Sequence, residues 1–318
     1  MVLKQVIEVF ELLDGADVSG HAVCQFLREH GLDMATTNHI KGDEGATDFI
    51  KVTIKGRKGI SSGGNAPTLG IVGRLGGIGA RPERVGIVSD ADGATTALSC
   101  AAKLAEMHSR GDVLAGDVII TTHVCPNAPV QPHEPVPMMG SPVEMAVMNR
   151  YEVDSLMNAI LSVDTTKGNR VAKFKGMAIT PTVKEGYLLK VSDDLLDILE
   201  WVTGKTPRVV PITTQDITPY GNSIYHINSI MQPWTVTTAP VVGVAITSDV
   251  AVPGCATGAS HITDIEVAAR FCIEVAKAFT SGKCSFYDSL EFQNLSTRYG
   301  SMKHLATLGE QAPSEDPR

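Results

Sequence analysis

The sequence contains little charge and few aromatic residues. Of its 318 residues, only 19% are charged and 5% aromatic, whereas 43% are hydrophobic. So few charges exclude a coiled coil or a long solvated helix, and the hydrophobic content is enough for a buried core. Basic residues are outnumbered 27 to 35, which gives a formal net charge of −8. We therefore expect no binding to nucleic acid or to an anionic membrane.

Cysteine pairs, long apolar runs and targeting signals are also missing. The six cysteines form no Cys-x-x-Cys pair, so we expect reduced thiols. No apolar run reaches the roughly 18 residues of a membrane span. The first 15 residues are typical of an amphipathic helix and lack the cleavage site of a signal peptide. These absences predict a soluble, cytoplasmic protein.

Short apolar runs alternate with helical stretches over most of the chain. This alternation predicts a mostly parallel mixed sheet covered by helices on both faces, a three-layer α/β/α fold. We expect a single domain over residues 1–305 and a flexible C-terminal tail over 306–318. The expected helices lie near 3–13, 19–31, 93–108, 193–203 and 264–279, and the expected strands at 47–55, 68–73, 84–89, 117–123, 160–164, 208–212 and 241–246.

Three of the apolar runs end in a residue that can bind a metal ion. These residues are Asp90, His123 and Asp164, and His261 follows the last run in a glycine-rich loop. In open α/β sheets, ligands bind beyond the carboxyl ends of the strands, and two aspartates with two histidines suit zinc or a similar ion. The alternative is that strand-end polar residues only cap helices, as Asp90 or Asp92 could for the helix at 93–108.

Several segments resemble the co-catalytic zinc aminopeptidase and deacylase superfamily, whose fold is phosphorylase/hydrolase-like. The layout is similar to that of the glutamyl-aminopeptidase, or tetrahedral-aminopeptidase, branch, and to a bacterial family of unknown function. The resemblance covers residues 1–280. It implies that the segments at 90–98 and 160–168 each contribute a metal-binding aspartate, and that the segment at 258–266 contributes the last histidine ligand. Its segments are an opening helix pair at 12–27, an Asp-x-x-x-Gly-x-x-Ala-Leu motif at 90–98, a strand ending in aspartate at 160–168, and a His-x-x-Asp/Glu segment at 258–266.

The chain departs from this pattern at three places. Where the family has Gly-His-x-Asp, this chain has Gly-Arg-Leu-Gly at 73–76, and no paired glutamates follow His123. The aspartate-containing loop before the last strand is represented by residues 220–223, Tyr-Gly-Asn-Ser. Two-zinc chemistry therefore does not carry over, and a reduced, mononuclear site remains.

The resemblance assigns roles to the remaining residues. Asp90, Asp164 and His261 would hold one divalent ion, with zinc as the first expectation and manganese, cobalt or nickel as alternatives. His123 would be a fourth ligand or a general base. Arg74 would occupy the space of the second ion, neutralising the aspartates or binding a ligand carboxylate. The alternative for His123 is a backbone-bonded histidine, and for Arg74 a surface arginine.

Two further residues near these motifs are weaker candidates. Cys125 could be a thiolate ligand or nucleophile, but a buried small residue fits it better. His133 lies in a proline-rich loop that acts either as a lid or as a rigid connector.

The leading hypothesis is a metal-dependent hydrolase of small amides or short peptides. The rivals are an inactive relative that binds a small amino-acid-like ligand, and an oligomeric scaffold. We expect a small-molecule or short-peptide substrate, no nucleic acid or membrane partner, and a homo-oligomer.

Overall fold

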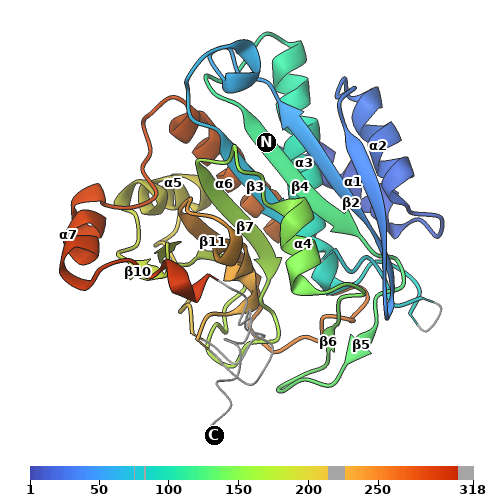
Figure 1. Ribbon diagram of the computed structural model, residues 1–318. Coiled ribbons are helices and arrows are strands. Elements are labelled where there is room, and N and C mark those ends of the chain that lie inside the picture. The colour runs from blue at the N-terminus through green and yellow to red at the C-terminus, as the bar shows by residue number, and fades with distance from the viewer. Residues whose placement is uncertain (75, 82–83, 214–225, 307–318) are drawn as a thin grey trace, which may run out of the picture.

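The computed structural model describes residues 1–74, 76–81, 84–213 and 226–306 (Figure 1). The described helices are α1 (Leu3–Asp14), α2 (Gly20–Glu29), α3 (Asp92–Ser109), α4 (Met145–Glu152), α5 (Asp193–Thr203), α6 (Ile262–Thr280) and α7 (Ser289–Tyr299). Short 3-10 helices are η1 (Ile60–Ser62), η2 (Ser89–Ala91), η3 (Ser229–Val236) and η4 (Lys303–Leu305). The predicted tail beyond residue 306 lies outside the described residues.

Nine of the described strands form one mixed sheet. They are β1 (Thr36–Gly42), β2 (Gly45–Ile54), β3 (Leu69–Gly73), β4 (Val118–Val124), β7 (Ala159–Thr165), β8 (Gly176–Ile179), β9 (Thr182–Lys184), β10 (Tyr187–Leu189) and β11 (Val241–Thr247). The order is β1-β2-β4-β3-β7-β11-β9-β10, with β8 also paired to β11. The central strands β4, β3, β7 and β11 are parallel, and their neighbours are antiparallel. A separate hairpin pairs β5 (Val130–Gln131) with β6 (Met138–Met139).

Helices cover both faces of the sheet, as the alternation predicted. On one face, α1, α3 and α6 pack against one another and α5 packs on α6; on the other lie α4 and η3 (Figure 1). Alternate residues of the central strands serve the two layers, because successive side chains of a strand point to opposite faces. In β7, Leu161 belongs to the core under α3 and α6, and Ile160 to the core under η3. The three-layer α/β fold is confirmed.

Local capping explains where two of the predicted helices begin or end. The Ser19 hydroxyl accepts a hydrogen bond from the Ala22 amide, 3.3 Å, at the start of α2. Ser192 caps α5 in the same way, and Gly204 ends that helix in the left-handed conformation at φ 62°. None of the described helices is long and apolar enough to cross a membrane.

Two of the predicted strands are wrong. Residues 84–89 contribute one isolated bridge, from Val88 to Thr257, because Gly86 turns the chain at φ 100° and η2 follows at once. Residues 208–212 also form only one bridge, from Val209 to Ile179. Each segment contains buried apolar residues, Val88 in the first and Val210 in the second, which gives the same sequence pattern as a buried strand.

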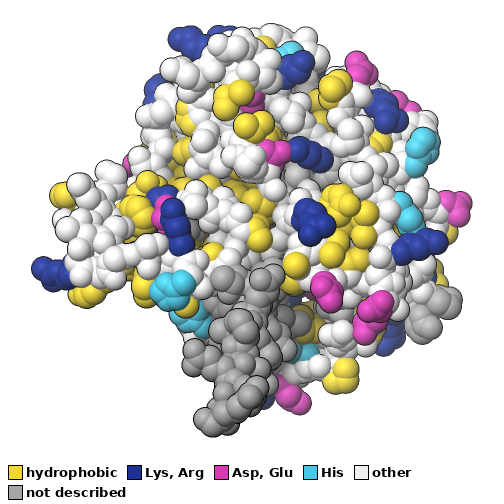
Figure 2. All heavy atoms as spheres, viewed as in Figure 1, with side chains coloured by type: hydrophobic (Ala, Val, Ile, Leu, Met, Phe, Trp, Pro, Cys, Tyr) yellow, Lys and Arg dark blue, Asp and Glu magenta, His cyan; other side chains and the backbone are white. Residues whose placement is uncertain are grey.

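Hydrophobic side chains also gather on the surface over α4, on the face shown in Figure 2. They belong to a small cluster around Phe49 and Met148, with Ile40, Met145, Val147 and Tyr151 partly buried against it. The homo-oligomer expected from the sequence stays a prediction, as does the single domain over residues 1–305.

Candidate functional site

The carboxyl edge of the parallel strands brings three of the predicted residues to one level. Gly73 of β3 pairs with Thr122 of β4 and with Val163 of β7. The next residue in each chain segment is therefore Arg74, His123 and Asp164, respectively. Each lies an even number of residues beyond a strand residue of the core under η3, so its side chain is on the same face of the sheet, and all three are buried. The parallel register thus explains why strand-end residues far apart in the sequence meet here.

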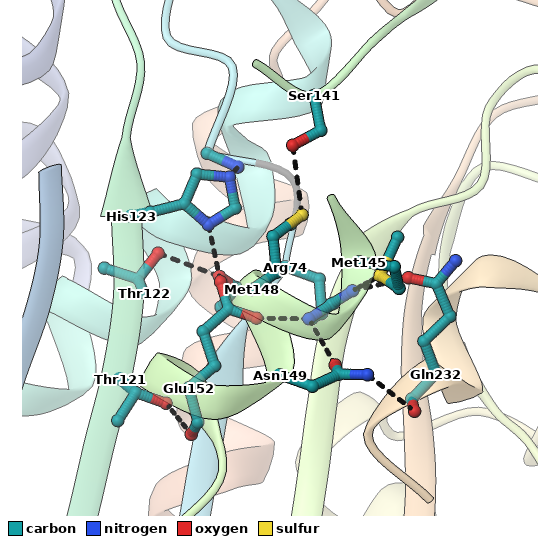
Figure 3. A network of polar contacts seen from close by, with 12 residues as sticks. Arg74, Thr121, Thr122, His123, Ser141, Met145, Met148, Asn149, Glu152 and Gln232 are labelled. Carbon is teal, nitrogen blue, oxygen red and sulfur yellow. Dashed lines mark hydrogen bonds and ion pairs between the residues drawn. The ribbon is translucent and has the colours of Figure 1, made fainter. Parts of the chain in front are cut away.

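A glutamate from α4 joins two of these residues. Glu152 accepts a hydrogen bond from His123 Nδ1 at 2.5 Å on one carboxylate oxygen, and forms an ion pair with Arg74 on the other. Figure 3 shows the carboxylate of Glu152 between the imidazole and the guanidinium. The side chains of Arg74 and Glu152 are both fully buried. The charges are therefore removed from water and must satisfy each other.

Uncharged groups complete the surroundings of the Arg74 guanidinium. It donates to the Gln232 Oε1 at 2.5 Å and to the Asn149 Oδ1 at 3.3 Å. Asn149 in turn donates to the Thr235 hydroxyl at 3.2 Å, so α4 and η3 are linked through the same network. The structure pairs Arg74 with Glu152, and its predicted role of neutralising the aspartates stays a prediction.

The charge balance of this network fixes the ionisation of Glu152. Burial by itself would raise the pKa of this carboxyl group, but the nearby Arg74 guanidinium and the His123 ring lower it below its usual value of 4.5. Glu152 is therefore ionised at neutral pH, and the network carries a stable buried negative charge beside Arg74.

Both ring nitrogens of His123 are used within the protein. Nδ1 bonds Glu152, and Nε2 accepts a hydrogen bond from the Gly76 amide at 2.9 Å. The Nε2 acceptor requires a ring with its proton on Nδ1. In this conformation His123 holds the loop after β3 against β4 and has no lone pair directed at a metal ion. Its predicted role as ligand or base would require breaking one of these bonds.

A second buried ion pair lies at the same edge of the sheet, on the side of α3. Lys167, two residues beyond β7, forms an ion pair with Asp92 in the first turn of α3 and donates to the Ala259 carbonyl at 2.8 Å. Burial raises the pKa of Asp92 above its usual value, although the Lys167 ammonium opposes this shift. The ion pair joins the end of β7 to α3, and the hydrogen bond to Ala259 joins it to the glycine-rich loop before α6.

A small pocket of about 40 Å³ opens beside this ion pair. Asp90, His133 and Lys167 contribute to its lining, together with Thr165 and Thr166. The two threonine hydroxyls are buried and have no hydrogen-bond partner within the described part of the chain. Buried hydroxyls without partners are costly, so they point to a bound polar group. His133 thus lies at the pocket, and the lid and the rigid connector both stay predictions.

The predicted metal ligands do not assemble into a coordination set in this structure. His261 is the residue before α6 and acts electrostatically on Asp92, while Asp90 accepts a hydrogen bond from the Met139 amide at 3.2 Å. Within the described ranges, no group of three or more His, Cys, Asp or Glu side chains is placed to hold a metal ion. The residues present therefore do not fit the expected ion as they stand, and the metal site formed by Asp90, Asp164, His261 and His123 stays a prediction.

Cys125 has the surroundings of a structural thiol. Its side chain is buried and donates to the Ala46 carbonyl at 3.4 Å. Burial raises the pKa of this thiol to about 11, so it is not a thiolate at neutral pH. The loop at 220–223, which replaces an aspartate-containing loop of the relatives, lies outside the described residues.

Sequence reasoning missed Glu152 and Lys167. The sequence contained a signal for Lys167, because this residue follows the strand-end Asp164 by three positions. Glu152 had none: it is the last residue of a short helix and is 78 positions from Arg74 in the sequence.

The chain has an α/β fold that is similar to the fold of aminopeptidases of known structure. The LapA aminopeptidase of Legionella pneumophila is similar, with a TM-score of 0.52 and 11% identity, over 90% of this chain and 72% of that enzyme. A mutant of tomato leucine aminopeptidase is similar with a TM-score of 0.50 and 12% identity, over 86% of this chain and 61% of that enzyme. At such low identity the similarity shows the fold alone.

The chain belongs to the family described as a protein of unknown function (DUF1177), which matches residues 38–309. No curated protein sequence is significantly similar to it. These comparisons do not select a branch of the aminopeptidases, so the similarity to the glutamyl-aminopeptidase branch stays a prediction.

Proposed function

We propose that this protein binds a small amino-acid-like molecule in the pocket beside Lys167. The observation that carries the proposal is the buried ion pair of Lys167 with Asp92 at the carboxyl edge of the sheet. An ammonium group carries three donors, and contacts within the described chain account for two of them. The third can donate to a ligand in the pocket that Lys167 lines.

The other groups around the pocket suit the two ends of such a ligand. The hydroxyls of Thr165 and Thr166 can bond a ligand carboxylate together with Lys167, and the Asp90 carboxylate can accept from a ligand amine. The pocket has room for only a few non-hydrogen atoms. It therefore suits the head group of the ligand, and the rest of the ligand extends outwards.

Thermal unfolding with matched ligands tests this proposal. The probes are alanine, alaninamide and N-acetylalanine, each added to the parent protein and to Lys167→Met and Lys58→Met. Lys58 is an exposed lysine away from the pocket. We expect alanine to raise the Tm of the parent and of Lys58→Met, in proportion to ln(1 + [L]/Kd), and to leave Lys167→Met unchanged. If none of the probes shifts the parent, or Lys167→Met responds as the parent does, the proposal is wrong.

Metal-dependent hydrolysis of small amides or peptides is a second candidate. The buried carboxyl groups of Asp90 and Asp164 at the sheet edge favour it, as does the aminopeptidase fold. An ion would have to be held by a set of residues that differs from the arrangement seen here. Metal analysis of protein purified without chelator or nickel resin decides between the two functions. A stoichiometric ion, with hydrolysis across an aminoacyl and acylamino-acid panel, would favour the second candidate.

A further inference from the structure

A separate pocket between α5 and α6 is lined by several cations. It has a volume of about 280 Å³ and lies where α5 ends, β8 begins and the first turns of α6 pass. Lys175, Lys205, Arg208 and Arg270 contribute to its lining, and the one acidic lining residue is Asp264. A four-to-one excess of basic residues contrasts with the whole chain, in which acidic residues outnumber basic ones 35 to 27.

Most of these cations are not neutralised by the protein itself. Across the described ranges, no acidic side chain forms an ion pair with Lys175, Lys205 or Arg208, whereas Arg270 pairs with Glu266 at 3.1 Å. Like charges that face one cavity repel one another, and an anion that enters it lowers the free energy of all of them. The pocket is therefore suited to a ligand with more than one negative charge.

The backbone fixes the positions of two of the cations. The Lys175 amide donates to the Asp249 carboxylate at 2.8 Å, and the Arg208 carbonyl accepts from the Ile179 amide at 3.1 Å. The Arg208 guanidinium lies 4.3 Å from the centre of the Phe174 ring. This stacking orients the planar guanidinium, and a planar fork of donors matches the oxygens of a phosphate better than a lysine does.

Asp264 indicates what else the ligand carries. It lies in the first turn of α6, is buried, and its Oδ2 has no hydrogen-bond partner within the described part of the chain. An ionised carboxylate only accepts hydrogen bonds, and a second anion beside it would be repelled. A ligand that places a hydroxyl against Asp264 and its charge against the cations satisfies both groups.

We propose that this pocket binds a small phosphate monoester that also carries a hydroxyl group. A phosphate monoester holds a charge of about −1.5 to −2 near neutral pH, which matches the unpaired cations. The volume is close to the lower limit of about 300 Å³ for small-molecule pockets, so the ligand is a small one. The site is distinct from the pocket beside Lys167 and does not depend on the proposed function.

Titration calorimetry in phosphate-free buffer tests the proposal, with glycerol 3-phosphate, inorganic phosphate and glycerol as probes. We expect the parent to bind glycerol 3-phosphate more tightly than phosphate, and glycerol not at all. Arg208→Met and Lys175→Met should each weaken binding about tenfold or more, since each removes a charged contact. Lys58→Met, which removes an exposed lysine outside the pocket, should bind as the parent does.

Asp264→Asn separates the two parts of the proposal. It should reduce the preference for glycerol 3-phosphate over phosphate while binding of phosphate itself becomes stronger, because a negative charge is removed. Circular dichroism and the Tm without ligand check that each variant is folded. The proposal is overturned if the parent binds neither anion, or if the Arg208 and Lys175 variants bind glycerol 3-phosphate as tightly as Lys58→Met.

Discussion

At the scale of single residues, the carboxyl edge is built on two buried ion pairs. Glu152 joins Arg74 and His123 under α4, and Lys167 joins Asp92 on the side of α3. Buried pairs of this kind contribute little net stability compared with apolar residues, but removal of one partner leaves an uncompensated charge. The variants that remove one partner are therefore the informative ones.

Glu152→Gln should lower the free energy of unfolding by about 3–5 kcal/mol, because the fully buried Arg74 guanidinium loses its counter-ion. Urea unfolding at neutral pH measures the loss. Glu144→Gln, an exposed residue just before α4, makes the same change of charge and should cost under about 0.5 kcal/mol. Equal stability of the two variants would show that Glu152 does not balance Arg74.

The stability of the parent should also depend on pH through Glu152. Its pKa is lower in the folded chain than the usual 4.5, so the folded state binds its proton less tightly than the unfolded state. The carboxylate therefore contributes stability that is fully present above the unfolded pKa and is lost as pH falls through the folded pKa. Urea unfolding of the parent and of Glu152→Gln from pH 7 down to about pH 3 should show a shallower acid loss for the variant.

The ion pair of Lys167 with Asp92 should behave as one unit. Lys167→Met should destabilise the protein by about 3–5 kcal/mol, whereas the double variant Lys167→Met with Asp92→Asn should recover part of the loss, since no buried charge remains. A double-mutant cycle from urea unfolding gives the coupling free energy, expected in the upper part of the usual range of about 0.5–3 kcal/mol. Additive effects would mean that the two side chains do not depend on each other.

At the scale of elements, the first turn of α3 is pressed against the ends of β3 and β7. A Cβ atom on Gly93 would collide with the carbonyl oxygens of Arg74 and Val163. This close approach brings Asp92 to the carboxyl edge, where Lys167 meets it. A glycine at this position therefore sets how near the helix can come to the site.

Gly93→Ala should push α3 away from the sheet edge and lower the free energy of unfolding by about 1–3 kcal/mol. Gly15→Ala is the milder control, because Gly15 has φ −59° and ψ 140°, which alanine adopts freely. A Cβ there would lie 3.2 Å from the Leu12 carbonyl oxygen, against 2.4 Å from the Arg74 oxygen for Gly93, so it should cost under about 1 kcal/mol. Thermal or urea unfolding of both variants makes the comparison. If the Gly93 variant is as stable as the control, the helix can move without cost.

At the scale of the whole molecule, one continuous sheet links the layers that carry the site. The core under α3 and α6 and the core under η3 meet along the same central strands. Layers that share one sheet should unfold together, in agreement with the single domain predicted over residues 1–305.

The two tryptophans allow a direct test of this cooperativity. Trp234 is fully buried in η3, whereas Trp201 on α5 is 75% exposed. In a Trp201→Phe variant, fluorescence reports on the η3 layer alone and far-ultraviolet circular dichroism on all helices. We expect the same urea midpoint from both signals. Two separate midpoints would mean that the layers unfold independently and that the single-domain prediction is wrong.

The sequence by itself determined the class of fold and the edge at which the site lies. Alternation of apolar runs with helical stretches depends on local periodicity, which a single chain shows directly. The strand predicted at 160–164 is β7 in the structure, and the helix predicted at 193–203 is α5. The placement of Arg74, His123 and Asp164 at strand ends followed from the same pattern.

Only the tertiary structure decided which side chains pair at that edge. Glu152 is 78 positions from Arg74, and Lys167 is 75 positions from Asp92. Such pairs depend on strand register and on how closely helices approach the sheet, and neither leaves a periodic signal in the sequence. The charges of Arg74 and Lys167 are balanced by these distant carboxylates because burial removes the water that would otherwise solvate them.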